Sequence, residues 1–202
     1  MPAPRPGRAG RAAGGIGRRG GHVIEQLELC ATHRFRVRHD PIVRFEAGVN
    51  ALAGPNGSGK TTILRAIHRC RECTLKADGR ARSVLFEAGR ANPDSEGYRP
   101  QNLRDMVLST RALFSSHGQI MRDVLSALPL EPGDILLLDE PEAGQDLRWI
   151  VELRESFDRV CHGLGIQIIM ASHHPAFWQG CNLIELAPNY VLETRRRYRG
   201  YL

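Results

Sequence analysis

Residues 54–62 read Gly54-Pro55-Asn56-Gly57-Ser58-Gly59-Lys60-Thr61-Thr62. They match the phosphate-binding pattern G-x-x-x-x-G-K-[ST], whose glycines let backbone N–H groups crowd around phosphate oxygens. An apolar run, 49–53, precedes the stretch, and a helical pattern, 61–69, follows it. This context places the positive N-terminal end of a helix behind the loop. We therefore interpret the stretch as a phosphate-binding loop rather than as a glycine-rich turn, with Lys60 contacting the β- and γ-phosphates and Thr61 offering a hydroxyl to Mg²⁺.

The length of 202 residues is typical of one domain, or of one domain with a tail. Residues 1–22 are rich in Gly, Arg and Pro, so we expect them to be disordered and assign the folded domain to residues 23–202. No apolar stretch reaches the roughly 20 residues that a membrane helix needs, and no secretory signal is visible. We expect a cytoplasmic protein that does not insert directly into a membrane.

The formal net charge of +6 resides mainly in the ends of the chain. Residues 1–22 hold five Arg and no acid; removing these five from the 28 Lys and Arg leaves 23 against 22 Asp and Glu. A second basic cluster, Arg195-Arg196-Arg197 with Arg199, closes the chain. Such ends can contact nucleic acid through its phosphates, but solvated tails are the commoner outcome. The basic ends therefore make DNA one candidate partner.

Five cysteines, odd in number and scattered along the chain, favour reduced thiols. They are Cys30, Cys70, Cys73, Cys161 and Cys181. Cys70 and Cys73 form a C-x-x-C with His68 nearby, but a zinc site needs a second ligand pair at matching spacing, and none is obvious. We interpret the pair as ordinary cysteines at the end of a helix.

Strands are expected where β-branched and aromatic residues cluster, and helices where apolar residues recur every three or four positions. The expected strands are 23–29, 35–37, 42–45, 50–53, 83–86, 134–140, 165–171 and 182–186, and the expected helices are 61–69, 103–114, 120–128 and 147–161. The segment 134–140 is nearly continuously apolar and ends in two acids, and 165–171 is a similar segment; such apolarity is typical of strands buried on both faces of a parallel sheet. The alternation predicts an α/β fold with a mostly parallel central sheet flanked by helices.

Polar residues follow these two buried strands. Asp139 ends the first and is placed to hold Mg²⁺ through its water shell. The adjacent Glu140 points elsewhere, toward the γ-phosphate, where it can orient and polarise a water molecule; the alternative for the pair is an N-cap of the next helix. His173 follows the second strand and reaches the same sheet edge, where it can donate a hydrogen bond to the γ-phosphate, with His174 as its rival.

Taken together, these residues resemble one family, the ABC-type ATPases. Within it they look most like the soluble branch that includes RecF, SMC and Rad50 heads and small stand-alone ATPases. Residues 54–62 match the Walker A loop, and residues 135–141 match Walker B with its catalytic Glu. Residues 115–119 look like the signature, with Ser116 and Gly118 as the matching pair.

The order and spacing of the motifs are similar to those of the family. Asp139 lies 20 residues after Gln119. Asp146, which matches the D-loop, follows Asp139 by seven residues, and His173, which matches the switch histidine, follows Asp146 by 27. The resemblance covers roughly residues 23–187.

The chain also departs from the family pattern. His117 replaces a signature glycine, and no Q-loop is identifiable, although Gln101 lies in a plausible position. Only 55 residues separate Lys60 from Ser116, which leaves no room for a coiled-coil arm. The resemblance therefore implies a P-loop NTPase with an N-terminal antiparallel β portion and a reduced helical subdomain.

The resemblance implies a homodimer that forms head to tail on ATP binding. Each ATP would lie between the Walker A loop of one chain and Ser116 and Gly118 of the other. Within one chain, Lys60 and the amides of 54–62 would bind phosphates, and Thr62 would assist at the α-phosphate. Thr61 and Asp139 would hold Mg²⁺. Glu140 would activate water, and His173 would sense the γ-phosphate. Phe35 and Phe45 are candidates for packing on the adenine.

The favoured function is an ATPase that hydrolyses ATP to drive a partner protein, in DNA maintenance or defence. The region Arg34-Phe35-Arg36, similar to RecF-like heads, and the short helical region support it. The alternatives are the nucleotide-binding subunit of a transporter, disfavoured by the missing Q-loop, and a slow ATP-gated clamp. A small-molecule kinase fits worst, because it leaves the Asp139-Glu140 pair and the signature unexplained.

Overall fold

The computed structural model describes residues 22–79, 82–88 and 127–199. Several expected features lie outside these residues: residues 1–21 of the tail, the helix expected over 103–114, most of the helix expected over 120–128, the signature stretch 115–119 and Gln101. The same holds for the expected helical subdomain.

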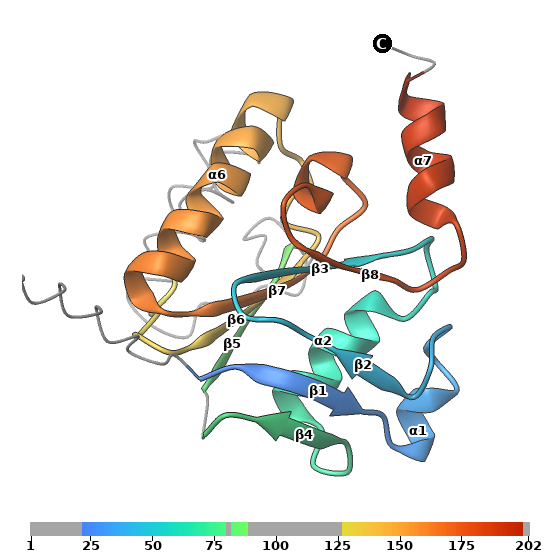
Figure 1. Cartoon of the computed structure of the whole chain (residues 1–202), viewed down its shortest axis with the longest axis vertical. Coiled ribbons are helices and arrows are strands. Elements are labelled where there is room, and N and C mark those ends of the chain that lie inside the picture. The colour runs from blue at the N-terminus through green and yellow to red at the C-terminus, as the bar shows by residue number, and fades with distance from the viewer. Residues whose placement is uncertain (1–21, 80–81, 89–126, 200–202) are drawn as a thin grey trace, which may run out of the picture.

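A five-stranded sheet forms the centre of the fold (Figure 1). Its strands, in spatial order, are β5 (Ser83–Glu87), β6 (Ile135–Asp139), β7 (Gln167–Ala171), β3 (Val49–Ala53) and β8 (Asn182–Glu185). All four strand pairings are parallel. Asp139 lies opposite Ala171, and Leu52 also lies opposite Ala171, so the carboxyl ends of β6, β7 and β3 meet at one edge. The segments that follow these strands are thereby brought together.

A second, antiparallel sheet contains β2 (Ile42–Arg44), β1 (Ile24–Glu28) and β4 (Thr74–Ala77), with β1 in the middle. The fully buried Gln167 links it to the central sheet. Its side-chain oxygen accepts from the Ile24 amide at 2.9 Å, and its amide nitrogen donates to the carbonyls of Ile24 and Glu46 at 2.9 and 2.8 Å. A buried side chain satisfied on both its oxygen and its nitrogen fixes the relative position of the two sheets.

Helix α2 (Lys60–Arg69) runs between the two sheets (Figure 1). Its buried face carries Ile63, Leu64 and Ile67, which pack with Leu27 of β1 and Leu137 of β6 in one apolar cluster. Alternate residues of the central strands point to the opposite face, as the period of two requires. The phosphate-binding loop is therefore anchored by a helix that is covered on both sides.

Helix α6 (Leu147–Leu164) covers the other face of the central sheet through Trp149, Ile150 and Phe157. The 3₁₀ turn η1 (Pro175–Trp178) and helix α7 (Tyr190–Arg199) extend this layer. Helix α6 ends at Gly165, whose φ of 63° lies in the left-handed region that glycine tolerates best.

The predicted fold class is confirmed: the central sheet is parallel, helices flank it, and the N-terminal strands form an antiparallel sheet. The strand predicted over 35–37 is wrong. The carbonyl of Cys30 accepts from the amides of His33 and Arg34 and forms the short helix α1 (Ala31–Arg34), and the following residues turn back against the phosphate-binding loop. Strand β4 and helices α1 and α7 were not predicted, because their short or polar sequences lack a clear apolar period.

Candidate functional site

The loop 54–62 has the backbone shape that its glycines predict. Gly57 and Gly59 have φ of 74° and 101°. A Cβ on Gly59 would lie 2.7 Å from both the carbonyl oxygen of Arg36 and the Cα of Val37, so no other residue fits here. The amide of Arg38 donates to the carbonyl of Ser58 at 3.0 Å. Residues 36–38 therefore support the loop from the side of α1.

Lys60 begins α2 and is buried. Its Nζ donates to the carbonyls of Gly54 and Pro55 at 2.8 and 3.2 Å, which holds the ammonium group against the loop. Burial lowers the pKa of Lys60, while the carboxylates of Glu140 and Asp139 raise it. The cation thus lies among acids at the end of β6 and just after it, although it is 79 positions from Asp139 in the sequence.

Thr61 and Asp139 contact each other directly. The Thr61 hydroxyl donates to Asp139 Oδ1 at 3.0 Å. Burial raises the pKa of Asp139, the hydrogen bond from Thr61 lowers it, and the neighbouring Glu140 raises it. A hydroxyl and a carboxylate at this separation are oxygen ligands of the kind that Mg²⁺ prefers.

Glu140 has a φ of 52°, in the left-handed region that a Glu rarely adopts. Its amide donates to the carbonyl of Ala171 at 2.9 Å, and its carbonyl accepts from Ala143 at 3.0 Å, which stabilises this conformation. Such strain costs on the order of 1–3 kcal/mol and gathers at functional sites. The side chain is half exposed, and its Oε1 lies 3.6 Å from Nε2 of His173.

His173 has one ring nitrogen engaged and one without a partner. Its Nδ1 lies 3.3 Å from the hydroxyl of Tyr190, while its Nε2 is buried and, among the described residues, has no hydrogen-bond partner. Burial lowers the pKa of His173, Lys60 lowers it further, and Glu140 raises it. The ring is therefore mainly neutral near pH 7; in the tautomer that carries its proton on Nε2, the Tyr190 hydroxyl donates to Nδ1.

His174 has a different environment. Its Nδ1 accepts from the amide of Ala176 at 3.3 Å and so caps η1. Burial lowers its pKa. Of the two histidines, His173 is the one whose imidazole faces Glu140.

Glu142 was not singled out from the sequence, yet it connects the two loops of the site. Its Oε1 accepts from the Ser172 hydroxyl at 2.8 Å and from the His173 amide at 2.7 Å. Burial raises the pKa of this carboxyl, and the bonds from His173 and Ser172 lower it. A second acid two residues after Glu140 was the signal available in the sequence. Tyr190 was also missed, and nothing in its local sequence indicates a site residue.

The remaining predicted residues lie as follows. Asp146 is the N-cap of α6, and its Oδ1 accepts from the Trp149 amide at 2.8 Å. The Ser58 hydroxyl is buried without a hydrogen-bond partner in the described part of the chain. Asn56 is exposed at the tip of the loop, and Thr62 is half-buried in α2. Ser116 and Gly118 lie outside the described residues.

Two family models match the chain at this site. One, described as "AAA domain", matches residues 26–83, which include the loop 54–62. The other, described as "AAA domain, putative AbiEii toxin, Type IV TA system", matches residues 123–177, which include Asp139, Glu140 and His173. The zinc import ATP-binding protein ZnuC of Chromohalobacter salexigens is 29% identical over 173 residues, which cover 74% of this chain and 72% of that protein. The chain is a P-loop ATPase of the ABC/AAA type.

One further sequence and one solved structure are similar to this ATPase. The DNA replication and repair protein RecF of Chlorobium luteolum is 44% identical over 45 residues, or 22% of this chain and 12% of that protein. The structure of cbiO1 from Clostridium perfringens, part of the ABC transporter complex cbiONQ, superposes with a TM-score of 0.51 at 17% identity over 79% of this chain and 85% of that one. In two other curated relatives, the part that matches this chain makes up only 16% and 28% of the relative's length.

No helix among residues 22–79, 82–88 and 127–199 combines the length and the apolarity that a bilayer crossing needs.

Proposed function

We propose that this ATPase binds ATP with Mg²⁺, hydrolyses it within a head-to-tail homodimer, and thereby drives a partner protein. The observation that carries the proposal is the meeting of Lys60, the Thr61–Asp139 pair and the Glu140–His173 pair at one edge of the parallel sheet. Ligands of open α/β sheets bind at this edge. Residues 23–202 form the ATPase domain in this proposal, and residues 1–22 a tail.

The side chains present fit ATP and Mg²⁺. The left-handed backbone of Gly57 and Gly59 and the N-terminal end of α2 suit phosphate oxygens. The ammonium of Lys60 is already held at the loop. Thr61 and Asp139 supply two oxygen ligands, and the Nε2 of His173 is a buried donor awaiting an acceptor. A triphosphate would offer acceptor oxygens to Lys60 and His173, and the Mg²⁺ that accompanies it would be held by the two oxygen ligands.

The roles follow from these positions. Bound Mg²⁺ supplies positive charge that offsets the charge on the β- and γ-phosphate oxygens. The half-exposed Glu140 orients water and accepts its proton, and its strained backbone fixes the direction of the carboxylate. His173, neutral and protonated on Nε2, donates a hydrogen bond toward the γ-phosphate, while Lys60 adds a fixed charge. Most of the rate enhancement then comes from positioning and charge.

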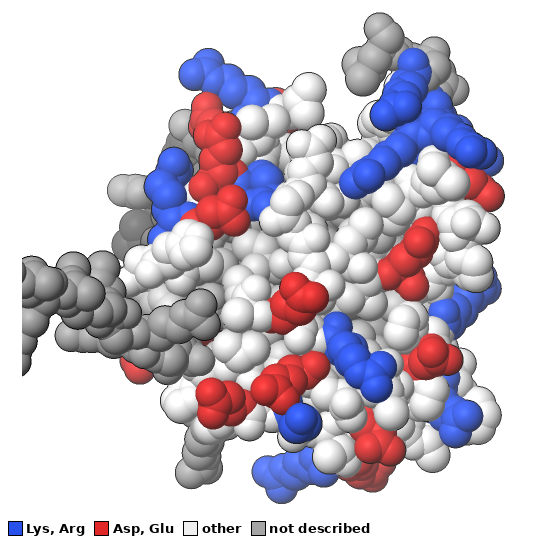
Figure 2. Space-filling view, in the orientation of Figure 1, with Lys and Arg blue, Asp and Glu red and all other residues white. Residues whose placement is uncertain are grey.

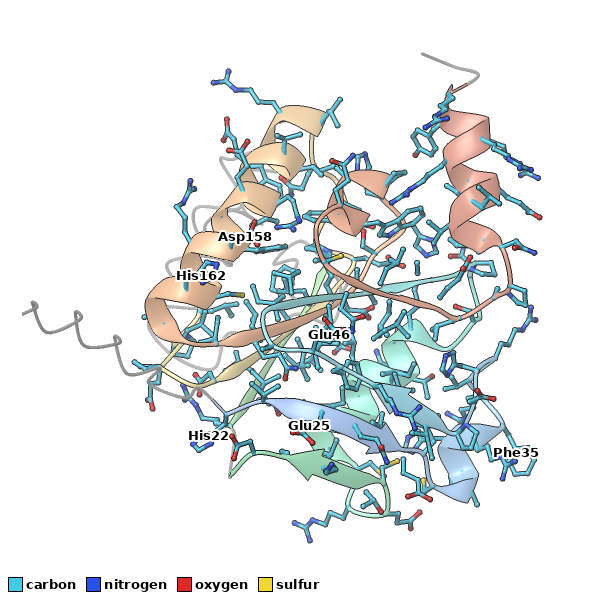
Figure 3. All side chains as sticks on the ribbon, viewed as in Figure 1. His22, Glu25, Phe35, Glu46, Asp158 and His162 are labelled. Carbon is cyan, nitrogen blue, oxygen red and sulfur yellow. The ribbon has the colours of Figure 1, made fainter. Side chains whose placement is uncertain are left out.

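Of the two aromatic residues predicted to pack on the adenine base, one remains a candidate. Phe45 is buried in the core beneath the antiparallel sheet and is not available for stacking. Phe35 is 90% exposed at the end of α1 and projects outward (Figure 3). The backbone of the next two residues, Arg36 and Val37, lies against Gly59. Phe35 is therefore next in the chain to residues that contact the phosphate-binding loop. Stacking on this ring is our proposal for base binding.

The dimer rests on the exposed rim of the site. Asn56, Gly57 and half of the Glu140 side chain face solvent in the single chain. In the proposed dimer, Ser116 and Gly118 of the second copy cover this rim and complete the γ-phosphate contacts, and Asp146 lies at the junction. The names of the matched relatives include a transporter ATP-binding protein and part of an ABC transporter complex, which support assembly with partners.

The partner defines the alternatives. The RecF relative and the Arg residues gathered in the last turn of α7 (Figure 2) favour a process involving DNA. The ZnuC relative and the cbiO1 likeness favour a transporter subunit instead. A slow ATP-gated clamp differs from both in its low turnover and long dimer lifetime.

The test compares wild type with Glu140→Gln. We expect ATP hydrolysis per chain to rise with protein concentration in wild type, because the site is completed by a second copy. Glu140→Gln should lower kcat about 100-fold or more, since a general base contributes roughly 10²–10⁴, and should elute as a dimer with ATP. The matched control is Glu152→Gln on the exposed face of α6, which should behave as wild type. A rate independent of concentration, or normal turnover by Glu140→Gln, would refute the proposal; DNA stimulation would favour the first partner class.

A further inference from the structure

Four potential metal ligands meet at the end of α2 opposite to the phosphate-binding loop. Cys30 is the N-cap of α1, and His33 lies within that helix. Cys70 is the C-cap of α2, and Cys73 directly precedes β4. Figure 1 shows α1 beside the connection from α2 to β4. The sequence alone led us to expect ordinary thiols at 70 and 73, and the fold places a second pair next to them.

The ligand atoms are close enough to share one ion. The Cys30 Sγ lies 3.1 Å from His33 Nδ1 and 4.0 Å from Cys70 Sγ, and Cys73 Sγ lies 3.4 Å from His33 Nδ1. All four ligand atoms lie within 4.8 Å of one another. In a tetrahedral site with Zn–S of about 2.3 Å and Zn–N of about 2.0 Å, ligand atoms are separated by about 3.5–3.8 Å. Small side-chain adjustments reach this geometry.

The backbone around the sulfur atoms is also suited to thiolates. The amide of Cys30 donates to Cys73 Sγ at 3.3 Å. Amides directed at metal-bound sulfur are the outer hydrogen bonds that orient ligands in metal sites. The backbone at Cys30 therefore supports the Cys73 sulfur with one N–H donor.

We propose that Cys30, His33, Cys70 and Cys73 bind a single structural Zn²⁺. Three thiolates and one imidazole in a compact tetrahedral arrangement are the ligand set that selects zinc among the common divalent metals. Both pairs have two residues between the ligands, as C-x-x-H and C-x-x-C, which is a spacing found in structural zinc sites. The site is complete with four protein ligands, so it leaves no open position for catalysis.

The zinc site is separate from the ATP site. Lys60 and Cys70 stand at opposite ends of α2, whose ten residues span about 15 Å. The ion would join the end of β1, helix α1, the end of α2 and the start of β4, although Cys30 and Cys70 are 40 positions apart in the sequence. It would also fix α1, from which residues 36–38 reach Gly59. Its role is to hold this corner of the fold.

The experiment measures metal in the full chain, purified without added metal or affinity-tag histidines. We expect one equivalent of zinc per chain by elemental analysis. Cys30→Ser, His33→Ala and Cys70→Ser should each reduce zinc at least tenfold and lower the melting temperature. The matched control is Cys181→Ser, whose sulfur donates only to the carbonyl of Phe177 and lies outside the cluster. It should retain one equivalent.

A measurement on the wild-type chain removes dependence on the folding of variants. After chelation and addition of Co²⁺, the intense visible bands and the thiolate charge-transfer band of tetrahedral thiolate-bound cobalt should appear and disappear on adding one equivalent of Zn²⁺. Absence of these bands with no zinc in the purified chain would overturn the proposal, as would zinc retained by Cys70→Ser. A Cys30–Cys70 disulfide or iron at this site would also overturn it. None of these readouts depends on ATP hydrolysis.

Discussion

Replacing Glu142 by Ala tests whether this buried carboxylate holds the loop after β6 to the loop after β7. Its Oε1 accepts two hydrogen bonds, from Ser172 Oγ at 2.8 Å and from the His173 amide at 2.7 Å. Ser172 is fully buried, and the ring of His173 faces Glu140. Alanine would leave both donors without their acceptor, and nothing else described in the chain holds the His173 amide.

The magnitude follows from the two lost bonds. Hydrogen bonds to a charged acceptor contribute about 1.5–3 kcal/mol each. Burial raises the pKa of Glu142, so deleting the carboxylate also removes a desolvated charge, which offsets part of the loss. We expect a net decrease of about 2–4 kcal/mol in the free energy of unfolding. For a domain of this length, that corresponds to a decrease of roughly 5–12 °C in Tm.

Catalysis should decrease as well, because a displacement of about 1 Å in a positioned group can cost on the order of 10² in rate. We therefore expect Glu142→Ala to lower kcat about 10- to 100-fold. Glu142→Gln retains an acceptor oxygen of the same reach and should recover most of both losses, which identifies a positioning role. The control is Glu152→Ala, which breaks an exposed pair with Arg148 and should change the unfolding free energy by less than about 0.5 kcal/mol.

Thermal melts, urea titrations and steady-state ATP hydrolysis measure these effects. An alanine variant whose Tm lies within about 2 °C of that of wild type and whose kcat is unchanged would refute the reasoning, because 2 °C corresponds to at most about 1 kcal/mol. A Gln variant as inactive as the Ala variant would show that the charge is needed, and would move Glu142 from positioning to proton transfer.

Three further substitutions probe single contacts. Tyr190→Phe removes the hydroxyl 3.3 Å from Nδ1 of His173, so kcat should fall about 2- to 10-fold, as expected for one neutral hydrogen bond, with KM unchanged; a change confined to KM would contradict this. Asp139→Asn should abolish hydrolysis yet raise Tm without nucleotide at pH 8. Burial raises the pKa of Asp139, so wild type loses stability as pH rises through the folded pKa and the carboxyl ionises, whereas the Asn variant does not. The difference in Tm between the variant and wild type should therefore narrow as pH falls toward 4.5. A constant or widening difference would contradict the direction of this pKa shift. Phe35→Ala should raise the Kd for ATP, measured by titration calorimetry, about 5- to 100-fold, because one stacking contact with the base is lost. Because Phe35 is 90% exposed, the Tm should stay within about 2 °C of that of wild type. An unchanged Kd would place the adenine elsewhere.

Local patterns predicted the strands, the helices and the loop of the ATP site well where apolar periodicity is strong. The segment 49–53 is apolar except for Asn50 and forms β3, and the apolar run 135–138 lies in β6. The prediction failed at 35–37, where Val37 is apolar but packs on Gly59 instead of pairing with a strand. It also missed β4, because its four residues are too few for their alternation to distinguish a strand from a loop.

The sequence by itself determined the chemistry of the loop 54–62 and the acids after β6, because a phosphate-binding loop depends on residue types at fixed local spacing. Only the tertiary structure decided what lies across from them. The contacts of Glu142 with His173, of His173 with Tyr190, and of Cys30 with Cys70 join residues that are 31, 17 and 40 positions apart. No local pattern encodes such pairs, because the register of parallel strands and the packing of α2 between two sheets bring them together.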